Sequence, residues 1–225
     1  MYFLYLIAYL IFIPACNNVP KMNTNKTSSE NIIEAVMNNR LDVVEAALKN
    51  GANVNTRNQK AASLLLLATR ANHLDMAKLL VAHKADVNSQ DDRLDSPFLY
   101  AGASGYLELV RLFLANGARF DIFNRYNGTA LIPACERGHL EVAKLLAFTN
   151  GYPIDHVNRL GWTALMEAVV LGDGSDIYAE VVQVLVDADC NVNIADKEGI
   201  TALQNAGSKG YKKIVDILER APRGF

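Results

Sequence analysis

Only a few residues in the chain have the types and spacing that catalysis or metal binding requires. Cys135 and His139 are four residues apart, and a thiol and an imidazole at that spacing could form a nucleophilic dyad. The run from Asp173 to Asp176 resembles the start of a calcium loop but lacks the further carboxylates that such a loop needs. The four histidines share no metal-ligand spacing, and the sequence contains no phosphate-binding glycine loop and no nucleophile elbow. We therefore expect no catalytic residue, no metal and no cofactor, and we interpret residues 173–176 as a connector.

The N-terminus has a different composition from the rest of the chain. Residues Tyr2 to Ala15 are uncharged and largely apolar, a run shorter than the roughly 18 residues that span a bilayer. Its length fits the apolar region of a secretory signal, about 7–15 residues. The run ends in Ile13-Pro14-Ala15-Cys16, which resembles the cleavage site of bacterial lipoproteins.

The lipoprotein resemblance implies a signal peptide over residues 1–15 and an acylated Cys16. Two or three acyl chains would anchor the protein stably, and the polar residues up to 27 would form a tether (16–27). Asn17, rather than Asp, follows the cysteine, which favours the outer membrane. We thus expect a membrane lipoprotein that faces the periplasm.

Two features depart from this pattern and leave other interpretations open. The segment has no Lys or Arg at its start, and Pro14 is unusual at its position. A start codon further upstream would explain the missing charge. Alternatively, the run is a buried apolar strand or helix at the N-terminus of a cytoplasmic protein.

The composition predicts a folded chain that does not bind nucleic acid. Of the 225 residues, 51% are hydrophobic and 20% are charged, and the net charge is −2 with the signs mixed. Nucleic-acid binding usually needs a dense basic stripe, which is missing here.

A repeat of 33 residues organises the rest of the sequence. Ser63, Ser96 and Thr129 are 33 residues apart, and later units begin at Thr163 and Thr201. The segments share T-A-L, G-H-L-E-V and N-G-A-x-V-N patterns. These patterns resemble the ankyrin repeat over residues 28–221, with 222–225 as a tail. The resemblance implies an all-α solenoid of about six helix-turn-helix units joined by hairpin-like fingers.

Each motif has a physical role in such a unit. Thr129 and Thr163 stand where a hydroxyl caps the first helix, and Gly138 supplies the positive φ of the turn that follows. The second helix places Leu140, Ala143 and Leu146 on one stripe.

Three further predictions concern single sites in the units. The spacing of Thr27 to Glu30 predicts a capping box that opens the first helix of the solenoid. Leu145 is expected to be buried, so that Leu145→Ala would cost about 2–5 kcal/mol. Pro133 falls in the opening turn of its helix, where proline costs little.

The repeat also assigns the cysteines and the two insertions. Cys135 and Cys190 fall at small apolar positions of separate units, so we expect two buried free thiols. His139 occupies the same turn position as His73, which favours a structural role over the dyad. One extra residue near Tyr152 and five extra residues around 172–179 are expected in loops.

Ankyrin-like proteins bind partners through the fingers and the exposed side of the first helices, so residues that vary there are candidates. The third and fourth fingertips combine aromatic and arginine residues, the types enriched at interface hot spots. The predicted partner-binding residues are Phe123, Arg125, Tyr126, Arg159, Leu160 and Trp162, with Asp92 and Arg93 from the second tip. The alternatives are that these rings stack on one another, that Trp162 is half-buried, and that the acidic second tip is only solvated surface.

These observations predict a non-catalytic protein-binding module, monomeric apart from its partner. The membrane would be reached only through Cys16. One specific version is a lipid-anchored immunity-type inhibitor that blocks a toxic enzyme in the cell envelope. The alternative is a scaffold or accessory protein for a resident enzyme, in the cytoplasm or the periplasm.

Overall fold

A computed structural model describes the chain from residue 24 to residue 222. Within these residues it consists of paired helices with no extended strand, as the sequence predicts. The first helices of the units are α1 (Thr24–Met37), α3 (Leu64–Arg70), α5 (Pro97–Ala103), α7 (Leu131–Glu136), α9 (Ala164–Val170) and α11 (Ala202–Lys209). The second helices are α2 (Leu41–Lys49), α4 (Leu74–Ala82), α6 (Leu107–Leu114), α8 (Leu140–Ala147), α10 (Asp176–Asp187) and α12 (Lys212–Arg220).

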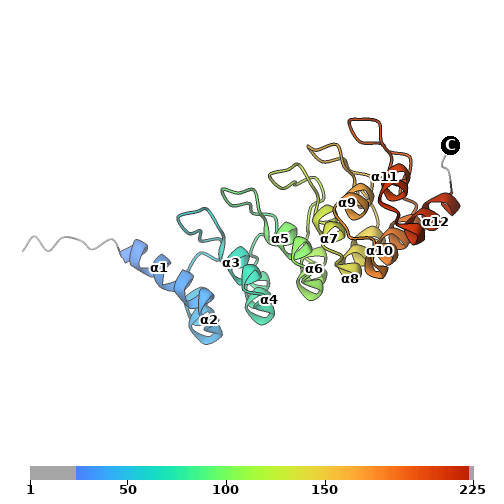
Figure 1. The fold of residues 1–225 in the computed structure, drawn as a ribbon. Helices are drawn as coiled ribbons and strands as arrows, with labels where there is room; N and C mark the ends of the chain where they lie inside the picture. Colours follow the sequence, from blue (N-terminus) through green and yellow to red (C-terminus); the bar gives the residue numbers. More distant parts are fainter. Residues whose placement is uncertain (1–23, 223–225) are drawn as a thin grey trace, which may run out of the picture.

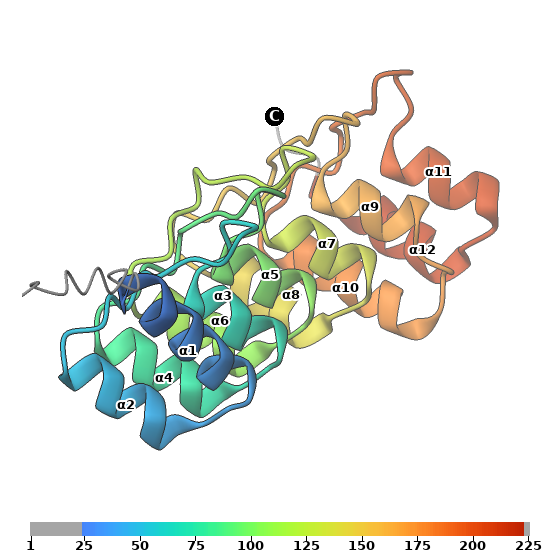
Figure 2. The ribbon, with the colours of Figure 1, turned by 90° about the vertical axis from the view of Figure 1, so that its left-hand side faces the viewer.

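The six helix pairs stack side by side into a curved solenoid, with the fingers projecting from one edge (Figures 1 and 2). We number the fingers first to fifth: residues 50–63, 83–96, 115–130, 148–163 and 188–201. Buried residues from every unit form one continuous apolar core. Because each unit covers only its neighbours, stability depends on contacts between adjacent units.

Hydroxyl caps start most of the first helices. Ser63, Ser96, Thr163 and Thr201 each accept a hydrogen bond from the backbone N–H three residues further on. The predicted cap at Thr129 is wrong, because α7 begins at Leu131, after Ala130.

The insertion in the fourth finger replaces the missing cap. The buried Tyr152 lies beneath the finger, and its hydroxyl accepts a hydrogen bond from the Leu131 N–H at 3.1 Å. The extra residue therefore has a structural function in the preceding unit, which the repeat frame alone does not reveal.

Each fingertip is closed by an Asn or Asp five residues before the Ser or Thr that precedes the first helix. Its side-chain oxygen accepts two backbone N–H groups of the tip, as Asn124 does from Tyr126 and Gly128, both at 2.9 Å. The other tips use Asn58, Asp91, Asn158 and Asp196 in the same way. The residue two positions before the cap then has a positive φ, and it is Leu94 in the second tip.

Several local predictions are confirmed, and two are wrong. Gly138 has a φ of 67°, and Pro133 lies in the first turn of α7. The first helix begins at Thr24, so Thr27 lies inside α1 and does not open it. Leu145 is only half-buried, because the stripe of α8 that faces the core passes through Val142, Ala143 and Leu146 instead.

The second insertion is only partly a loop. Residues from Asp176 onward form the first turn of α10, which is the longest of the second helices with 12 residues. Gly174 adopts a φ of 74° beneath the ring of Tyr211, which leaves no room for a Cβ atom. The turn is therefore packed against the last unit, and it is not the free connector that the sequence predicts.

Candidate partner-binding groove

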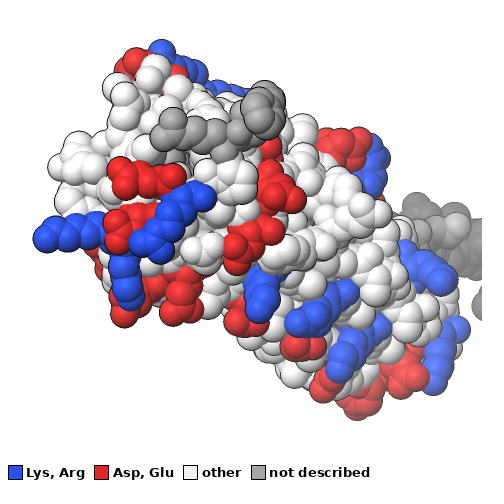
Figure 3. Space-filling view, turned by 90° about the vertical axis from the view of Figure 1, so that its right-hand side faces the viewer, with Lys and Arg blue, Asp and Glu red and all other residues white. Residues whose placement is uncertain are grey.

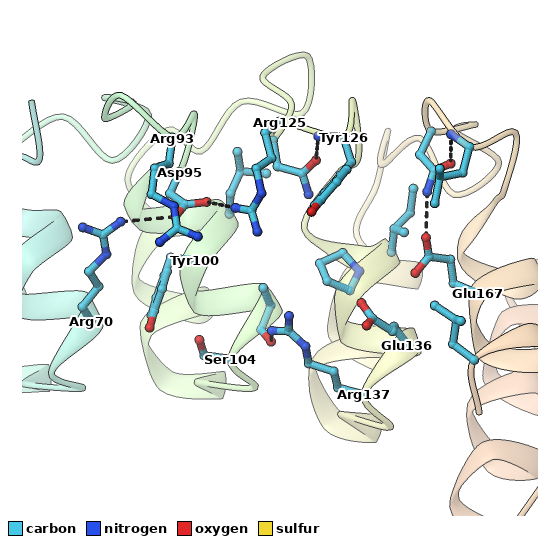
Figure 4. Close-up of a pocket in the computed structure, with 18 residues that line it drawn as sticks. Arg70, Arg93, Asp95, Tyr100, Ser104, Arg125, Tyr126, Glu136, Arg137 and Glu167 are labelled. Atoms are coloured by element: carbon cyan, nitrogen blue, oxygen red, sulfur yellow. Dashed lines mark hydrogen bonds and ion pairs between the residues drawn. The ribbon is translucent and has the colours of Figure 1, made fainter. Parts of the chain in front are cut away.

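A groove runs between the fingers and the first helices of the second to fifth units. It has a cavity volume of about 620 Å³ and is lined by α3, α5, α7 and α9 and by the tips of the second, third and fourth fingers (Figure 4). We call this cavity the groove. A cavity of this volume is large enough to hold part of another molecule.

The helix residues of the groove come from fixed positions of the repeat. They stand three, four, seven or eight residues after the Ser or Thr that precedes each first helix. The polar ones are Arg70, Tyr100, Ser104, Glu136, Arg137 and Glu167. None of these helix residues is among the fingertip residues that the sequence predicts, although aligning the repeats at these offsets identifies them.

At the end formed by α3 and α5, the charges neutralise one another. Arg70 forms ion pairs with Asp91 at 2.7 Å and Asp95 at 3.2 Å, and Arg125 lies 3.6 Å from Asp95. Arg70 also lies over the ring of Tyr100, 5.5 Å from its centroid. Each buried or half-buried acid here faces a guanidinium.

The pKa of Asp91 reflects this pairing. Burial alone would raise it, but hydrogen bonds from Arg70 and from the backbone N–H groups of Asp95 and Arg93 lower the pKa below its ordinary value. Asp91 is therefore a carboxylate at neutral pH, both in the fingertip and in the ion pair.

At the other end, α7 and α9 place Glu136 and Glu167 next to each other (Figure 4). Glu167 is 5% exposed, and its carboxyl accepts a hydrogen bond from the Asn158 amide at 2.7 Å. Burial and the charge of Glu136 raise its pKa to about 7, although Asn158 and Arg137 act in the opposite direction. Among residues 31–222, neither glutamate has a Lys, Arg or His within ion-pair distance.

Four of the predicted partner-binding residues line the groove. They are Arg93, Arg125, Tyr126 and Leu160. Tyr126 is 52% exposed and Leu160 is 49% exposed, so both offer apolar surface to a ligand. Arg125 lies over the Tyr126 ring, 4.8 Å from its centroid, and this contact, opposed by partial burial, raises the pKa of the guanidinium.

The other predicted residues lie elsewhere. Phe123 stacks on His156 of the next finger, with centroids 4.3 Å apart, and not on another of the predicted aromatic residues. Trp162 is half-buried against the core. Arg159 and Asp92 are exposed outside the groove, where their backbones join adjacent fingers. Cys16 lies outside the described residues.

The cysteines and His139 are buried or half-buried in the described part of the chain. Cys135 and Cys190 are buried free thiols, and burial raises the pKa of Cys190 to about 12 and that of Cys135 further. Burial lowers the pKa of His139, whose ring packs on Gly105. Among residues 24–222 there is no group of three His, Cys, Asp or Glu that could hold a metal ion. None of the described helices is long and apolar enough to span a bilayer.

The surface carries both charges in mixture. On the face that Figure 3 shows, acidic and basic side chains alternate without a field of one sign. This distribution agrees with the composition and gives no basic stripe on that face.

Comparison with known proteins gives one consistent family. The family model described as ankyrin repeats (3 copies) matches residues 6–91, 32–124, 84–151, 98–194 and 131–221. The crystal structure of an ankyrin repeat domain from Acinetobacter baumannii AYE is 44% identical, with a TM-score of 0.82 over 84% of this chain and 96% of that one. Another ankyrin repeat protein of known structure is 35% identical, with a TM-score of 0.82 over 85% and 97% of the two chains.

Sequence relatives match over shorter segments. The ankyrin repeat protein YahD of Escherichia coli (strain K12) is 37% identical over 94 residues, which is 42% of this chain and 47% of YahD. The human NAD-capped RNA hydrolase NUDT12 is 34% identical over 92 residues, or 40% of this chain and 19% of NUDT12. The match thus spans about half of YahD and about a fifth of NUDT12.

Proposed function

The chain belongs to the ankyrin-repeat family, and from that premise we propose that it holds a segment of another protein in the groove, without catalysing a reaction. The observation that carries the proposal is the lining of the groove, where Tyr100, Tyr126, Arg125 and Arg137 surround about 620 Å³ of accessible space. Tyrosine and arginine are the residue types that dominate binding energy at interfaces. The rigid stack of helices holds them in place before a partner arrives.

A photo-crosslinking amino acid in place of Tyr126 tests this surface. Expressed in cells that naturally contain the protein, the Tyr126 variant should join covalently to a discrete partner. The matched control places the same amino acid at Lys78, which is exposed on α4, a second helix away from the groove. Equal labelling from both positions would contradict the assignment of the groove.

We further propose that the protein works in the cell envelope, anchored through Cys16 and blocking a toxic enzyme. The support is the sequence from Ile13 to Cys16, together with a rigid groove that could occlude an active site. The second candidate is a scaffold for a resident enzyme, which the same groove could serve.

Intact mass measurement of the protein from native membranes tests the anchor. The expected species begins at Cys16 with acyl chains, and Cys16→Ala should abolish it. An unmodified full-length chain would rule out the envelope version. Once the crosslinked partner is known, its enzymatic activity with and without this protein separates the inhibitor, which lowers it, from the scaffold, which does not.

A further inference from the structure

We infer that the end of the groove between α7 and α9 receives a cationic side chain, arginine or lysine, of the partner, and that Glu136 and Glu167 hold it. The inference rests on the proposed function, since it takes the groove as the partner site. It goes further by specifying the charge of the partner side chain that binds at the α7–α9 end.

The first step is the geometry of the two carboxyl groups. Glu167 projects from α9 and Glu136 from α7 into the same part of the groove (Figure 4). One oxygen of Glu167 accepts the Asn158 amide, and no described residue donates to the other. The Glu136 side chain likewise has no hydrogen-bond donor among the described residues, so acceptor capacity remains free at this end.

The second step is the missing positive charge. The nearest cation is Arg137 on α7, and its guanidinium donates to the Ala103 carbonyl instead of pairing with either glutamate. Burial and the charge of Glu136 both disfavour the ionised form of Glu167. A cation from outside would be attracted there by both carboxylates, of which Glu167 is buried.

The third step is the shape of the walls. Leu160 and Leu171, 49% and 50% exposed, line the same groove from the fourth finger and the end of α9. A long aliphatic stem with a charged end fits such a site, since the stem covers apolar surface while the head reaches the carboxylates. An acidic side chain would be repelled at this position.

The groups that control the ionisation of Glu167 are few. Glu136 raises its pKa and Arg137 lowers it, both from α7. The helices α10 and α11, which also pack on α9, contribute no charge to this pKa. A bound cation must therefore compete with one proton at Glu167, and its affinity must depend on pH.

The test uses the whole protein and a small capped peptide, acetyl-Gly-Arg-Gly-amide, whose own charge does not change between pH 5.5 and 8.5. The neutral control is the same peptide with citrulline, which keeps the shape and loses the charge. Binding is followed by NMR of the glutamate side chains. With a Glu167 pKa of about 7, the arginine peptide should bind about 30-fold more weakly at pH 5.5 than at pH 8.5.

Two variants localise the effect. Glu167→Gln keeps an acceptor for Asn158 and should remove the pH dependence. Glu136→Gln should weaken binding and shift its pH dependence to lower pH, because the charge of Glu136 raises the pKa of Glu167. Glu141→Gln, on the exposed surface of α8, should change neither. Thermal unfolding checks that all three variants are folded.

Equal binding of the citrulline peptide, or arginine binding that does not change with pH, would overturn the inference. Such a result leaves the proposed function standing if Tyr126 still crosslinks a partner. Conversely, a groove that binds the peptide but crosslinks no protein would refute the proposed function, so the two failures are distinguishable.

Discussion

The two ends of the groove differ in how the charges of their acidic residues are neutralised. Both ends contain two acidic side chains. At the α3–α5 end, the chain supplies Arg70 and Arg125 to neutralise Asp91 and Asp95. At the α7–α9 end, Glu136 and Glu167 are left without a cation in the described chain, and the pKa of Glu167 rises to about 7 through burial and the neighbouring charge.

The difference arises at two positions of the repeat. One is seven residues after the Ser or Thr that precedes a first helix, where Arg70 and Glu136 stand, and the other is in the fingertip. Asp91 and Asn158 both stand five residues before the helix cap, and both fold their fingertip through the same two backbone contacts. Asp91 is negatively charged and is neutralised by Arg70. Asn158 is neutral and donates a hydrogen bond to the Glu167 carboxyl group, so it brings no charge to the groove. The acids at one end are therefore paired within the protein, and at the other end we propose that a cation of the partner pairs with them.

Substitutions in the apolar core that both ends share should cause the largest loss of stability. They serve as the reference for the smaller changes at the two ends of the groove. Leu146→Ala removes a fully buried side chain from α8 and should cost about 3–4 kcal/mol of unfolding free energy in urea denaturation. Leu145→Ala, at a half-buried site, should cost less than half as much. A larger loss at Leu145 would contradict the orientation of α8.

Removing Arg70, the cation that pairs with Asp91, should cause the second-largest loss of stability. Arg70→Met keeps the aliphatic stem but leaves Asp91 buried and unpaired, at a cost of about 2–3 kcal/mol at pH 7. The pKa of Asp91 is lowered in the folded chain, so its stabilising contribution is present above pH 3.8 and lost as the pH falls further. The cost should therefore shrink in unfolding experiments as the pH falls below 3.8. A cost that is constant with pH would show that the pairing contributes nothing.

At the α7–α9 end, removing a charged group should raise the stability of the protein instead of lowering it. The folded pKa of Glu167 is raised from 4.5 to about 7, so the unliganded protein loses stability as the pH rises through that interval. Glu167→Gln should thus stabilise the protein by about 1–2 kcal/mol at pH 8 and have almost no effect at pH 4. Denaturation at both pH values measures the stability of the variant relative to the unsubstituted protein. A variant that is less stable than the unsubstituted protein at pH 8 would contradict the difference between the two ends.

The smallest effects should separate structural from free aromatic residues at the fingertips. Phe123→Ala removes the stacking on His156 and should cost about 1 kcal/mol. Tyr126→Ala changes an exposed ring and should cost less than about 0.5 kcal/mol, while it weakens partner binding. Thermal unfolding gives the first comparison, and binding to the crosslinked partner gives the second.

The sequence by itself determined the repeating framework. The period of 33 residues, the Ser and Thr caps and the turn at Gly138 are local features, because helix starts and tight turns depend on a few neighbouring residues. The solenoid and its fingers follow from them, since each unit must cover an apolar face of the next. The predicted fingertip residues Arg125 and Tyr126 also lie at the groove for this reason.

Tertiary structure decided which side chains meet. Arg70 pairs with Asp91, 21 residues away, and Tyr152 caps the helix that begins at Leu131, also 21 residues away. Phe123 turns toward His156 instead of a partner. Such contacts cross from one unit to the next, where the stacking distance and the side-chain direction together select the neighbour. A repeat frame specifies neither quantity, so the charge balance of the groove emerges only when the units are stacked.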